Sequence, residues 1–259
     1  MAYLMESADE GTRLAAKTDR AIVDEELALT GLRTGTRALD AGCASGAVTL
    51  AIADRVGPTG VVTGVDLSAE RLEEARLRLG DRATFHCARL EQLPFEAGAF
   101  DYVMCRLVLE YAAQPQPIVD ELARVCAPGG RVVLADIDGY ASFHHPLAGE
   151  RAEAIEAITA LLRKTGFDPY VGRKLYAFAR AAKLQNVRVH VRPYHVIAGP
   201  IDSIGLENWR YKLQTLAPLG HRVLGAARYD AYVKALVELL LDEDAFTYSV
   251  IMLAVGDKA

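Results

Sequence analysis

The stretch ALDAGCASG, residues 38–46, is a short apolar strand that leads into a turn, with Asp40 just before its first glycine. From there to Asp138, apolar runs of strand length alternate with amphipathic segments of helix length. Parallel strands need crossover connections, which helices normally supply with a right-handed turn. The alternation therefore predicts an α/β fold, with a doubly wound parallel sheet and helices on both faces.

Local signals predict several boundaries. Ser68 is suited to cap the helix that follows it. Pro128-Gly129-Gly130 predicts a turn before the strand RVVLADI, residues 131–137. The strand NVRVHVR, residues 186–192, alternates so that one face carries Val187, Val189 and Val191.

Two helical insertions interrupt the later part of the pattern, at about 139–172 and at about 199–244. A last strand, FTYSVIMLAVG, follows at 246–256. Because no repeat or linker marks a second domain, residues 1–259 are expected to form a single domain. We expect the two insertions to form a cap over a substrate pocket.

Composition narrows the class of partner. The chain is 51% hydrophobic and 24% charged, as is usual for a globular protein, and its formal net charge is -5. The acidic balance and the lack of a Lys/Arg run argue against nucleic acid and favour a small molecule. No segment reaches the roughly 18 uninterrupted apolar residues of a membrane helix, and the N-terminus has no apolar signal region. We expect a cytoplasmic protein without a membrane partner, either a monomer or a homodimer.

The cysteines do not indicate a metal site. They are far apart, without a C-x-x-C pair, and no His pair has metal-ligand spacing. We expect no metal, and we expect all four to be small apolar residues near the sheet: Cys43, Cys87, Cys105 and Cys126.

The opening stretch also predicts a binding site. Ligands of open parallel sheets bind outside the carboxyl ends of the strands, where the strand order reverses. If ALDAG is the first strand, Asp40, Gly42 and Gly46 lie in that loop. The next strand, VVTGVD, ends in Asp66, 24 residues after Gly42, where a carboxylate can accept hydrogen bonds from both hydroxyls of a ribose.

These motifs resemble a known family. LDAGCASGAVTLAIA, residues 39–53, resembles the first motif of the class I S-adenosylmethionine-dependent methyltransferases, and VDLS, residues 65–68, resembles their ribose-binding acidic motif. Residues 88–115 resemble the family's adenine loop and fourth strand, and residues 121–138 resemble its helix and PGG turn before the fifth strand. The resemblance implies S-adenosylmethionine as cofactor. It also implies a Rossmann-like, seven-stranded sheet whose last strand is antiparallel.

The resemblance implies a set of cofactor-binding residues, which lie in the first loop, after the second strand, in the adenine loop and after the fourth strand: Asp40, Gly42, Cys43, Ala44, Gly46, Asp66, Leu67, Arg89, Leu90, Glu91 and Arg106. Tyr3 and Arg13 either approach the cofactor's amino-acid end or belong to a helix that packs on the sheet edge. Two residues depart from the family pattern. Ala44 stands where a glycine is usual, and Arg89 stands about where an acidic residue usually binds the adenine amine. Leu90 N–H and Glu91 remain available for the adenine.

His144 and His145 are the candidate catalytic residues, because they follow the fifth strand. A general base there would help a hydroxyl or acidic carbon nucleophile. The alternative is that one of them packs against or caps the loop before Pro146. His195 is a further candidate. Several aromatic side chains are candidates either for the substrate pocket or for the core of the cap: Tyr111, Tyr140, Tyr170, Tyr194, Trp209 and Tyr211.

Three functions from different classes remain open. The first is transfer of a methyl group to an O, N or C nucleophile of a small molecule, such as a secondary metabolite. The second is an enzyme that keeps the cofactor but catalyses a cyclisation or an elimination. The third is a binding module without cofactor.

Overall fold

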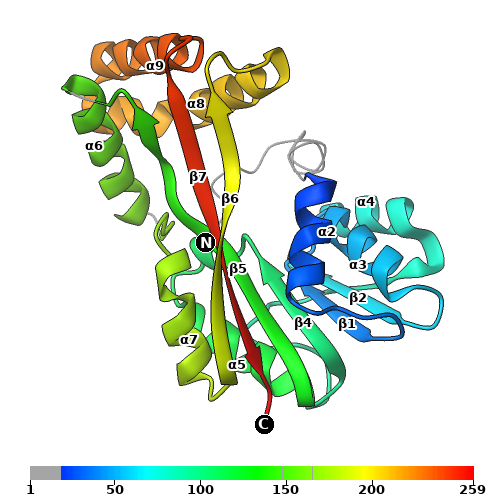
Figure 1. Ribbon diagram of the computed structural model, residues 1–259. Coiled ribbons are helices and arrows are strands. Elements are labelled where there is room, and N and C mark those ends of the chain that lie inside the picture. Colours follow the sequence, from blue (N-terminus) through cyan, green and yellow to red (C-terminus); the bar gives the residue numbers. More distant parts are fainter. Residues whose placement is uncertain (1–18, 148, 165) are drawn as a thin grey trace. The chain divides into compact units, whose positions relative to one another are not determined.

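The computed structural model describes residues 19–147, 149–164 and 166–259. Its strands form one seven-stranded sheet in the order β3-β2-β1-β4-β5-β7-β6 (Figure 1). The pairs from β3 to β5 are parallel, and β7 runs antiparallel to its neighbours β5 and β6. The strands are β1 Arg37–Ala41, β2 Val61–Asp66, β3 Thr84–Cys87, β4 Phe100–Arg106, β5 Cys126–His145, β6 Gln185–Ala198 and β7 Phe246–Asp257. The predicted α/β fold class, with its antiparallel last strand, is confirmed.

Helices connect the parallel strands. α3 (Ala47–Val56) and α4 (Ala69–Leu79) join β1 to β2 and β2 to β3. α5 (Pro115–Val125) joins β4 to β5. β4 and β5 lie on the other side of β1 from β2 and β3, so the sheet grows in the opposite direction there. Because such crossovers are right-handed, this reversal places α5 on the other face of the sheet from α3 and α4. The switch point of the sheet therefore lies between β1 and β4.

The remaining helices pack on these or follow the later strands. α2 (Arg20–Leu29) packs on α3, and α7 (Leu175–Ala181) packs on α5. Single 3₁₀ turns lie at Gly80–Arg82, Leu109–Tyr111 and Gly172–Lys174. Ser68 caps α4 as predicted, since its hydroxyl accepts a hydrogen bond from Arg71 N at 3.3 Å. No helix within the described ranges has both the length and the apolar character that spanning a membrane requires.

The core is centred on β1 and β4, which have neighbours on both sides. Leu39, Val103 and Met104 are fully buried. Strands covered on both faces read as continuous apolar runs, and this is why ALDA and YVMC show no polar alternation. The rigid centre of the sheet therefore carries the loops that follow β1 and β4.

The chain divides into two compact units. One comprises the described residues up to Asp136, Arg173–His190 and Met252–Ala259, and the other comprises Ile137–Gly172 and Val191–Ile251. The predicted insertions contain α6 (Glu150–Lys164) in the first, and α8 (Ser203–Leu224) and α9 (Ala226–Leu240) in the second. Their role as a cap stays a prediction.

The fifth strand differs from its prediction. β5 extends over Cys126–His145 and includes the Pro128-Gly129-Gly130 segment, which was expected to be a turn. The register with β4 shifts there, because Phe100 pairs with Cys126 and Tyr102 pairs with Arg131. The glycines still bond as in a strand, since Gly129 N donates to Lys258 O and Lys258 N donates to Gly130 O. Pairing with the end of the chain, which is not visible in the local sequence, replaces the turn.

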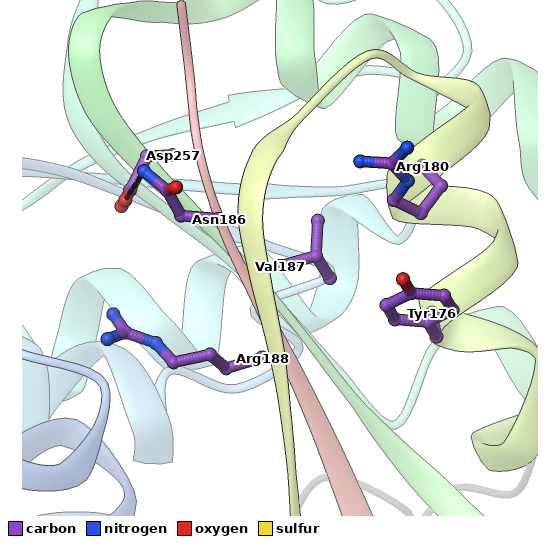
Figure 2. Close-up of a pocket in the computed structure, with 6 residues that line it drawn as sticks. All are labelled: Tyr176, Arg180, Asn186, Val187, Arg188 and Asp257. Carbon is purple, nitrogen blue, oxygen red and sulfur yellow. Dashed lines mark hydrogen bonds between the residues drawn. The ribbon is translucent and has the colours of Figure 1, made fainter.

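The two edges of the sheet also differ from the expectations. Val189 and Val191 of β6 are 41% and 58% exposed, so the alternating valines do not form a buried face. In Figure 2, Val187 projects from β6 toward α7, whereas Arg188 projects to the other side. Cys87 of β3 is exposed, although Cys43, Cys105 and Cys126 are buried as expected. Among the described residues, β6 and β3 each have a single neighbour in the sheet, so both are edge strands, which are less covered than the central strands.

Candidate cofactor site

The loop after β1 turns sharply at two glycines. Gly42 and Gly46 have φ of 83° and 80°, a region that glycine adopts without steric cost. A Cβ at Gly42 would lie 2.3 Å from Val108 Cγ2, and one at Gly46 would lie 2.9 Å from Leu79 Cδ1. Both positions therefore require glycine for close packing as well as for the turn. Gly42 N and Cys43 N donate to Val65 O at 2.7 and 3.0 Å, which ties the loop to β2.

Asp66 joins this loop to the end of β2. Its Oδ2 accepts a hydrogen bond from Ala44 N, and its Oδ1 accepts one from Ser68 N, each at 2.9 Å. A carboxylate has about four acceptor positions. Because Asp66 is only partly buried, positions remain on the solvent side that can accept further donors.

Ala44 has φ of 45°, in the left-handed region. A residue with a Cβ pays roughly 1–2 kcal/mol for this conformation. This alanine therefore adopts the backbone shape that the family usually gives to glycine, and its N–H points at Asp66. The departure from the family pattern therefore strains the loop.

Asp40 is 2% exposed, and its Oδ2 accepts a hydrogen bond from Thr49 Oγ1 at 2.6 Å. Burial raises the pKa of Asp40 from 3.8 to about 6, against the Thr49 hydrogen bond, which lowers it. The charge of Asp66 raises the same pKa, and the charge of Arg106 lowers it. The end of β1 therefore holds a carboxylate that is costly to ionise and is stabilised by nearby positive charge.

Arg106, at the end of β4, forms a buried ion pair with Glu26 of α2. Arg106 Nε donates to Glu26 Oε2 at 2.7 Å and Nη2 donates to Glu26 Oε1 at 3.2 Å. The two side chains are 6% and 0% exposed. The Arg106 guanidinium is thus engaged with α2, and it acts on Asp40 through its charge. The prediction that Arg106 contacts the cofactor stays a prediction.

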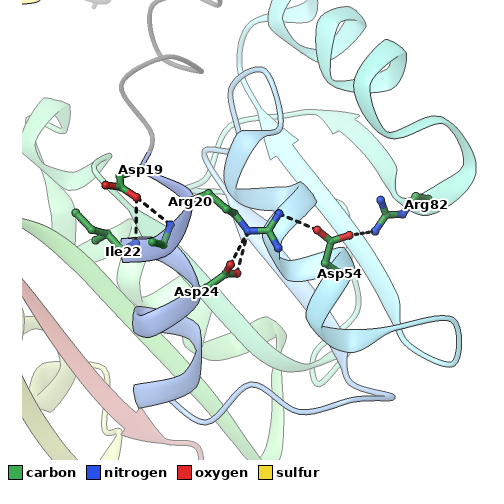
Figure 3. A network of polar contacts seen from close by, with 7 residues as sticks. Asp19, Arg20, Ile22, Asp24, Asp54 and Arg82 are labelled. Atoms are coloured by element: carbon green, nitrogen blue, oxygen red, sulfur yellow. Dashed lines mark hydrogen bonds and ion pairs between the residues drawn. The ribbon is translucent and has the colours of Figure 1, made fainter. Parts of the chain in front are cut away.

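A second, exposed network holds the start of α2 (Figure 3). Asp19 caps the helix by accepting from Ala21 N at 2.9 Å. Arg20 contacts Asp24 at 2.9 Å and Asp54 of α3 at 2.7 Å, and Arg82 also contacts Asp54. The Arg82 hydrogen bond, with that of Arg20, lowers the pKa of Asp54. Exposed pairs contribute about 0–1 kcal/mol each, whereas loss of one partner from a buried pair costs more because it leaves a buried charge uncompensated.

The ends of β2 and β3 present an apolar surface beside Asp66. Leu67 is 62% exposed, and Cys87 Sγ donates to Leu67 O at 3.4 Å. In the predicted adenine loop Leu90 is buried, and Arg89 pairs with Glu91 at 2.8 Å. The acidic side chain that could accept from an adenine amine is therefore held by the arginine that departs from the family pattern.

Cys43 lies in the loop but is not set up as a nucleophile. Its side chain is 5% exposed, and burial, with the charges of Asp40 and Asp66, raises the pKa of the thiol far above its ordinary value. A thiol reacts as its thiolate, which is suppressed here. Cys43 therefore fills space between the loop and Gly64, at which a Cβ would lie 2.8 Å from its Sγ.

The predicted histidines belong to the other compact unit, at the end of β5. His144 is 8% exposed, its Nδ1 lies 2.8 Å from Thr247 Oγ1, and its ring lies 6.1 Å from that of Trp209. His145 is exposed. His195 Nδ1 lies 3.1 Å from Ser249 Oγ. Each of the two bonded rings faces a hydroxyl of β7.

Sequence reasoning missed three contributors. Thr49 and Glu26 are polar residues on otherwise apolar helix faces, and this pattern could have identified them. Glu26, for example, shares its face with the buried Val23 and Leu27. Val108 carried no signal. Tyr3 and Arg13 lie outside the described residues. Within those residues, no group of three or more His, Cys, Asp and Glu side chains is arranged to hold a metal ion.

The arrangement fits a nucleoside cofactor with a cationic group. Asp66 offers acceptors beside the exposed Leu67, as a ribose with an attached base requires. The loop from Gly42 to Gly46 contains only small residues, and Gly42 and Ala44 are partly exposed. Asp40 supplies negative charge beneath the loop. These features agree with the donor set that the sequence motifs predict.

Comparison with known proteins gives the same assignment. The methyltransferase domain family matches residues 39–134. The chain is 38% identical over 108 residues to a demethylmenaquinone methyltransferase of Staphylococcus aureus, which covers 41% of this chain and 45% of the relative. The chain thus matches less than half the length of the curated relatives.

Solved structures share the fold over nearly the whole chain. A putative methyltransferase from Bacillus halodurans has a TM-score of 0.59 at 17% identity and covers 93% of this chain and 99% of its own. The [4+2]-cyclase SpnF has a TM-score of 0.57 at 21% identity and covers 92% of this chain and 81% of its own. Residues 39–134 are therefore similar to the methyltransferase domain family, and the fold of the whole chain is shared with solved structures that include methyltransferases.

Proposed function

We propose that the protein transfers a methyl group from S-adenosylmethionine to an O, N or C nucleophile of a small molecule. The observation that carries this proposal is the junction of two motifs at the switch point, where Asp66 accepts hydrogen bonds from the Ala44 and Ser68 amides. The match of the methyltransferase domain family to residues 39–134 supports it.

This chain's residues have distinct tasks in the proposal. Asp66 accepts hydrogen bonds from the ribose hydroxyls, Leu67 packs on the adenine, and the backbone from Gly42 to Gly46 approaches the methionine part. Asp40 favours the cationic cofactor through its charge. S-adenosylmethionine supplies a sulfonium methyl that is already electrophilic, so the protein's main contributions are orientation and exclusion of water.

Replacement of Asp66 with alanine should weaken binding of S-adenosylmethionine by about 1–3 kcal/mol, because the ribose hydroxyls lose their acceptor. Titration calorimetry measures the change. Asp81→Ala is the matched control, since this aspartate is exposed in the turn after α4. Equal affinity in wild type and Asp66→Ala would show that the ribose lies elsewhere. No binding to wild type would instead favour the cofactor-free module.

We propose His144 as the general base. Its Nδ1 lies 2.8 Å from Thr247 Oγ1, a contact that orients the ring, and a neutral imidazole has one ring nitrogen that can accept a proton. His144→Ala should then lower turnover by about 10²–10⁴-fold for a hydroxyl acceptor and remove the acidic limb of the pH profile. His145→Ala, the matched control, should change neither. S-adenosylhomocysteine formation over a panel of small hydroxyl, amine and carbon acids gives the measurement, and an unaltered His144→Ala profile would exclude the role.

A non-methylating reaction is the second candidate. The fold likeness to the [4+2]-cyclase SpnF over 92% of the chain supports retaining it. The two candidates differ in stoichiometry. Methyl transfer yields one S-adenosylhomocysteine per product, whereas a cyclisation or elimination leaves the cofactor unconsumed.

A further inference from the structure

We propose that the edge of β6 over Gln185–His190 binds an extended, acidic segment of another protein, which adds a strand to the sheet. This surface lies on β6 and α7, outside the predicted cofactor site. Three independent features carry the proposal: the free edge of β6, a hollow along that edge, and a concentration of positive charge.

The edge is open. Among the residues that the structure describes, β6 is the last strand of the sheet and its one neighbour is β7. Gln185, Asn186, Arg188 and Val189 are exposed. An edge strand presents unpaired N–H and C=O groups along its free side, and an extended peptide can pair with them.

A hollow of about 490 Å³ follows this edge, lined by Tyr176, Arg180, Asn186, Val187, Arg188 and Asp257. Figure 2 shows Tyr176 and Arg180 on α7, with Val187 projecting to that side of β6, while Asn186 and Arg188 project to the other side. Successive side chains of a strand point to opposite faces, so an added strand would place its own side chains on both faces in the same way. A hollow with lining residues on both sides of one strand suits such a segment better than a compact small molecule.

The charge of this region is opposite to that of the protein. Residues 169–201 contain six of the 29 Lys and Arg residues and none of the 34 Asp and Glu residues. Five of the six lie in the same compact unit as the hollow, and all five are exposed: Arg173, Lys174, Arg180, Lys183 and Arg188.

The acidic residue in the lining does not offset this charge. Asp257 Oδ1 accepts from Arg131 Nη2 at 2.9 Å, and its Oδ2 accepts from Asn186 Nδ2 at 3.3 Å. Within the described chain, Arg180 makes no ion pair, so its charge is available to a partner. The net charge of the hollow is therefore positive, and an acidic partner fits it.

A second copy of the chain is a poorer occupant. Two β6 edges in contact would bring Arg188 and its basic neighbours against the same residues of the other copy, and like charges across strands are destabilising. Charged edges of this kind block self-association while admitting a partner of opposite charge. The observations therefore favour an acidic peptide.

The test uses the full-length protein and a fluorescent peptide of alternating glutamate and valine, as long as Gln185–His190. Anisotropy should report binding tighter than about 1 mM, and binding should weaken with added salt. Arg180→Glu with Arg188→Glu should weaken it roughly tenfold or more. Arg78→Glu, an exposed helix arginine on α4, is the matched control and should have no effect. Unchanged thermal melting of all variants shows that they are folded.

Backbone pairing has its own readout. Two further peptides are N-methylated at alternate residues, one at the odd positions and one at the even positions, so that each lacks N–H donors along one edge. The peptide that lacks the donors facing β6 should lose binding, and the other should retain it. Equal binding by both N-methylated peptides, or equal displacement by heparin, would mean a general polyanion surface and would overturn the proposal. Displacement of the peptide by millimolar inorganic phosphate would overturn the proposal and indicate a site for small anions. If the peptide does not bind at all, the proposal is wrong and the edge is not a binding site.

Discussion

Replacement of Glu26 with alanine should reduce the free energy of unfolding by about 3–5 kcal/mol, the usual result of removing one partner from a buried ion pair. Glu26 is completely buried, and it receives two hydrogen bonds from Arg106. The alanine variant leaves the Arg106 guanidinium buried without this carboxylate. Urea unfolding followed by circular dichroism measures the loss.

Two further variants separate charge from packing. Glu26→Leu combined with Arg106→Met removes both charges and keeps much of the volume, so its stability should be close to that of wild type. Asp101→Ala breaks an exposed ion pair, in which Arg37 is 48% exposed and Asp101 is 44% exposed. This change should reduce the free energy of unfolding by about 1 kcal/mol or less. If Glu26→Ala costs no more than Asp101→Ala, the variant does not leave an uncompensated buried charge at Arg106.

Replacement of Asp40 with asparagine should make the protein more stable than wild type at neutral pH. Burial raises the pKa of Asp40 from 3.8 to about 6. Well below pH 3.8 the carboxyl group is protonated in both folded and unfolded chains. As the pH rises, the unfolded chain releases this proton before the folded chain does, so the wild-type protein loses stability. The loss reaches about 3 kcal/mol near pH 7, and asparagine does not undergo it.

The measurement is the difference in free energy of unfolding between Asp40→Asn and wild type across this pH range. Other titrating groups cancel in the difference, which should rise between about pH 4 and pH 6 and then level off. A flat difference would show that Asp40 titrates normally. The asparagine keeps an acceptor for Thr49 Oγ1, which limits the change to the charge. Asp40→Asn should also weaken binding of the cofactor, because the cationic cofactor is no longer attracted by the Asp40 carboxylate.

The fold was predictable where periodicity is local. The alternation of strands and helices from Ala38 to Asp138 predicted the parallel part of the sheet, and the resemblance implied the antiparallel last strand. The length of β5 was not predictable, because Gly129 and Gly130 pair with Lys258 at the far end of the chain. The exposed valines of β6 were missed for a similar reason, since alternation shows that residues share a face but not what covers it.

The candidate site was predictable to the extent that it is built from glycines and acids at strand ends. Gly42, Gly46 and Asp66 lie together in the loops where the motifs predicted them. The partners of these residues were not predicted. Val108 packs on Gly42 and Thr49 bonds Asp40, and both contacts depend on how β1 is placed beside β4 and α3.

The sequence by itself therefore determined the class of the fold and the positions of the glycine loop and of Asp66, because strand periodicity and glycine turns depend on near neighbours. Only the tertiary structure decided which charges meet. Arg106 and Glu26 are 80 residues apart, yet they form the buried pair beneath the predicted site. The physical reason is that ion pairing and burial follow from the order of the strands and the packing of α2 on α3, and no local pattern encodes either.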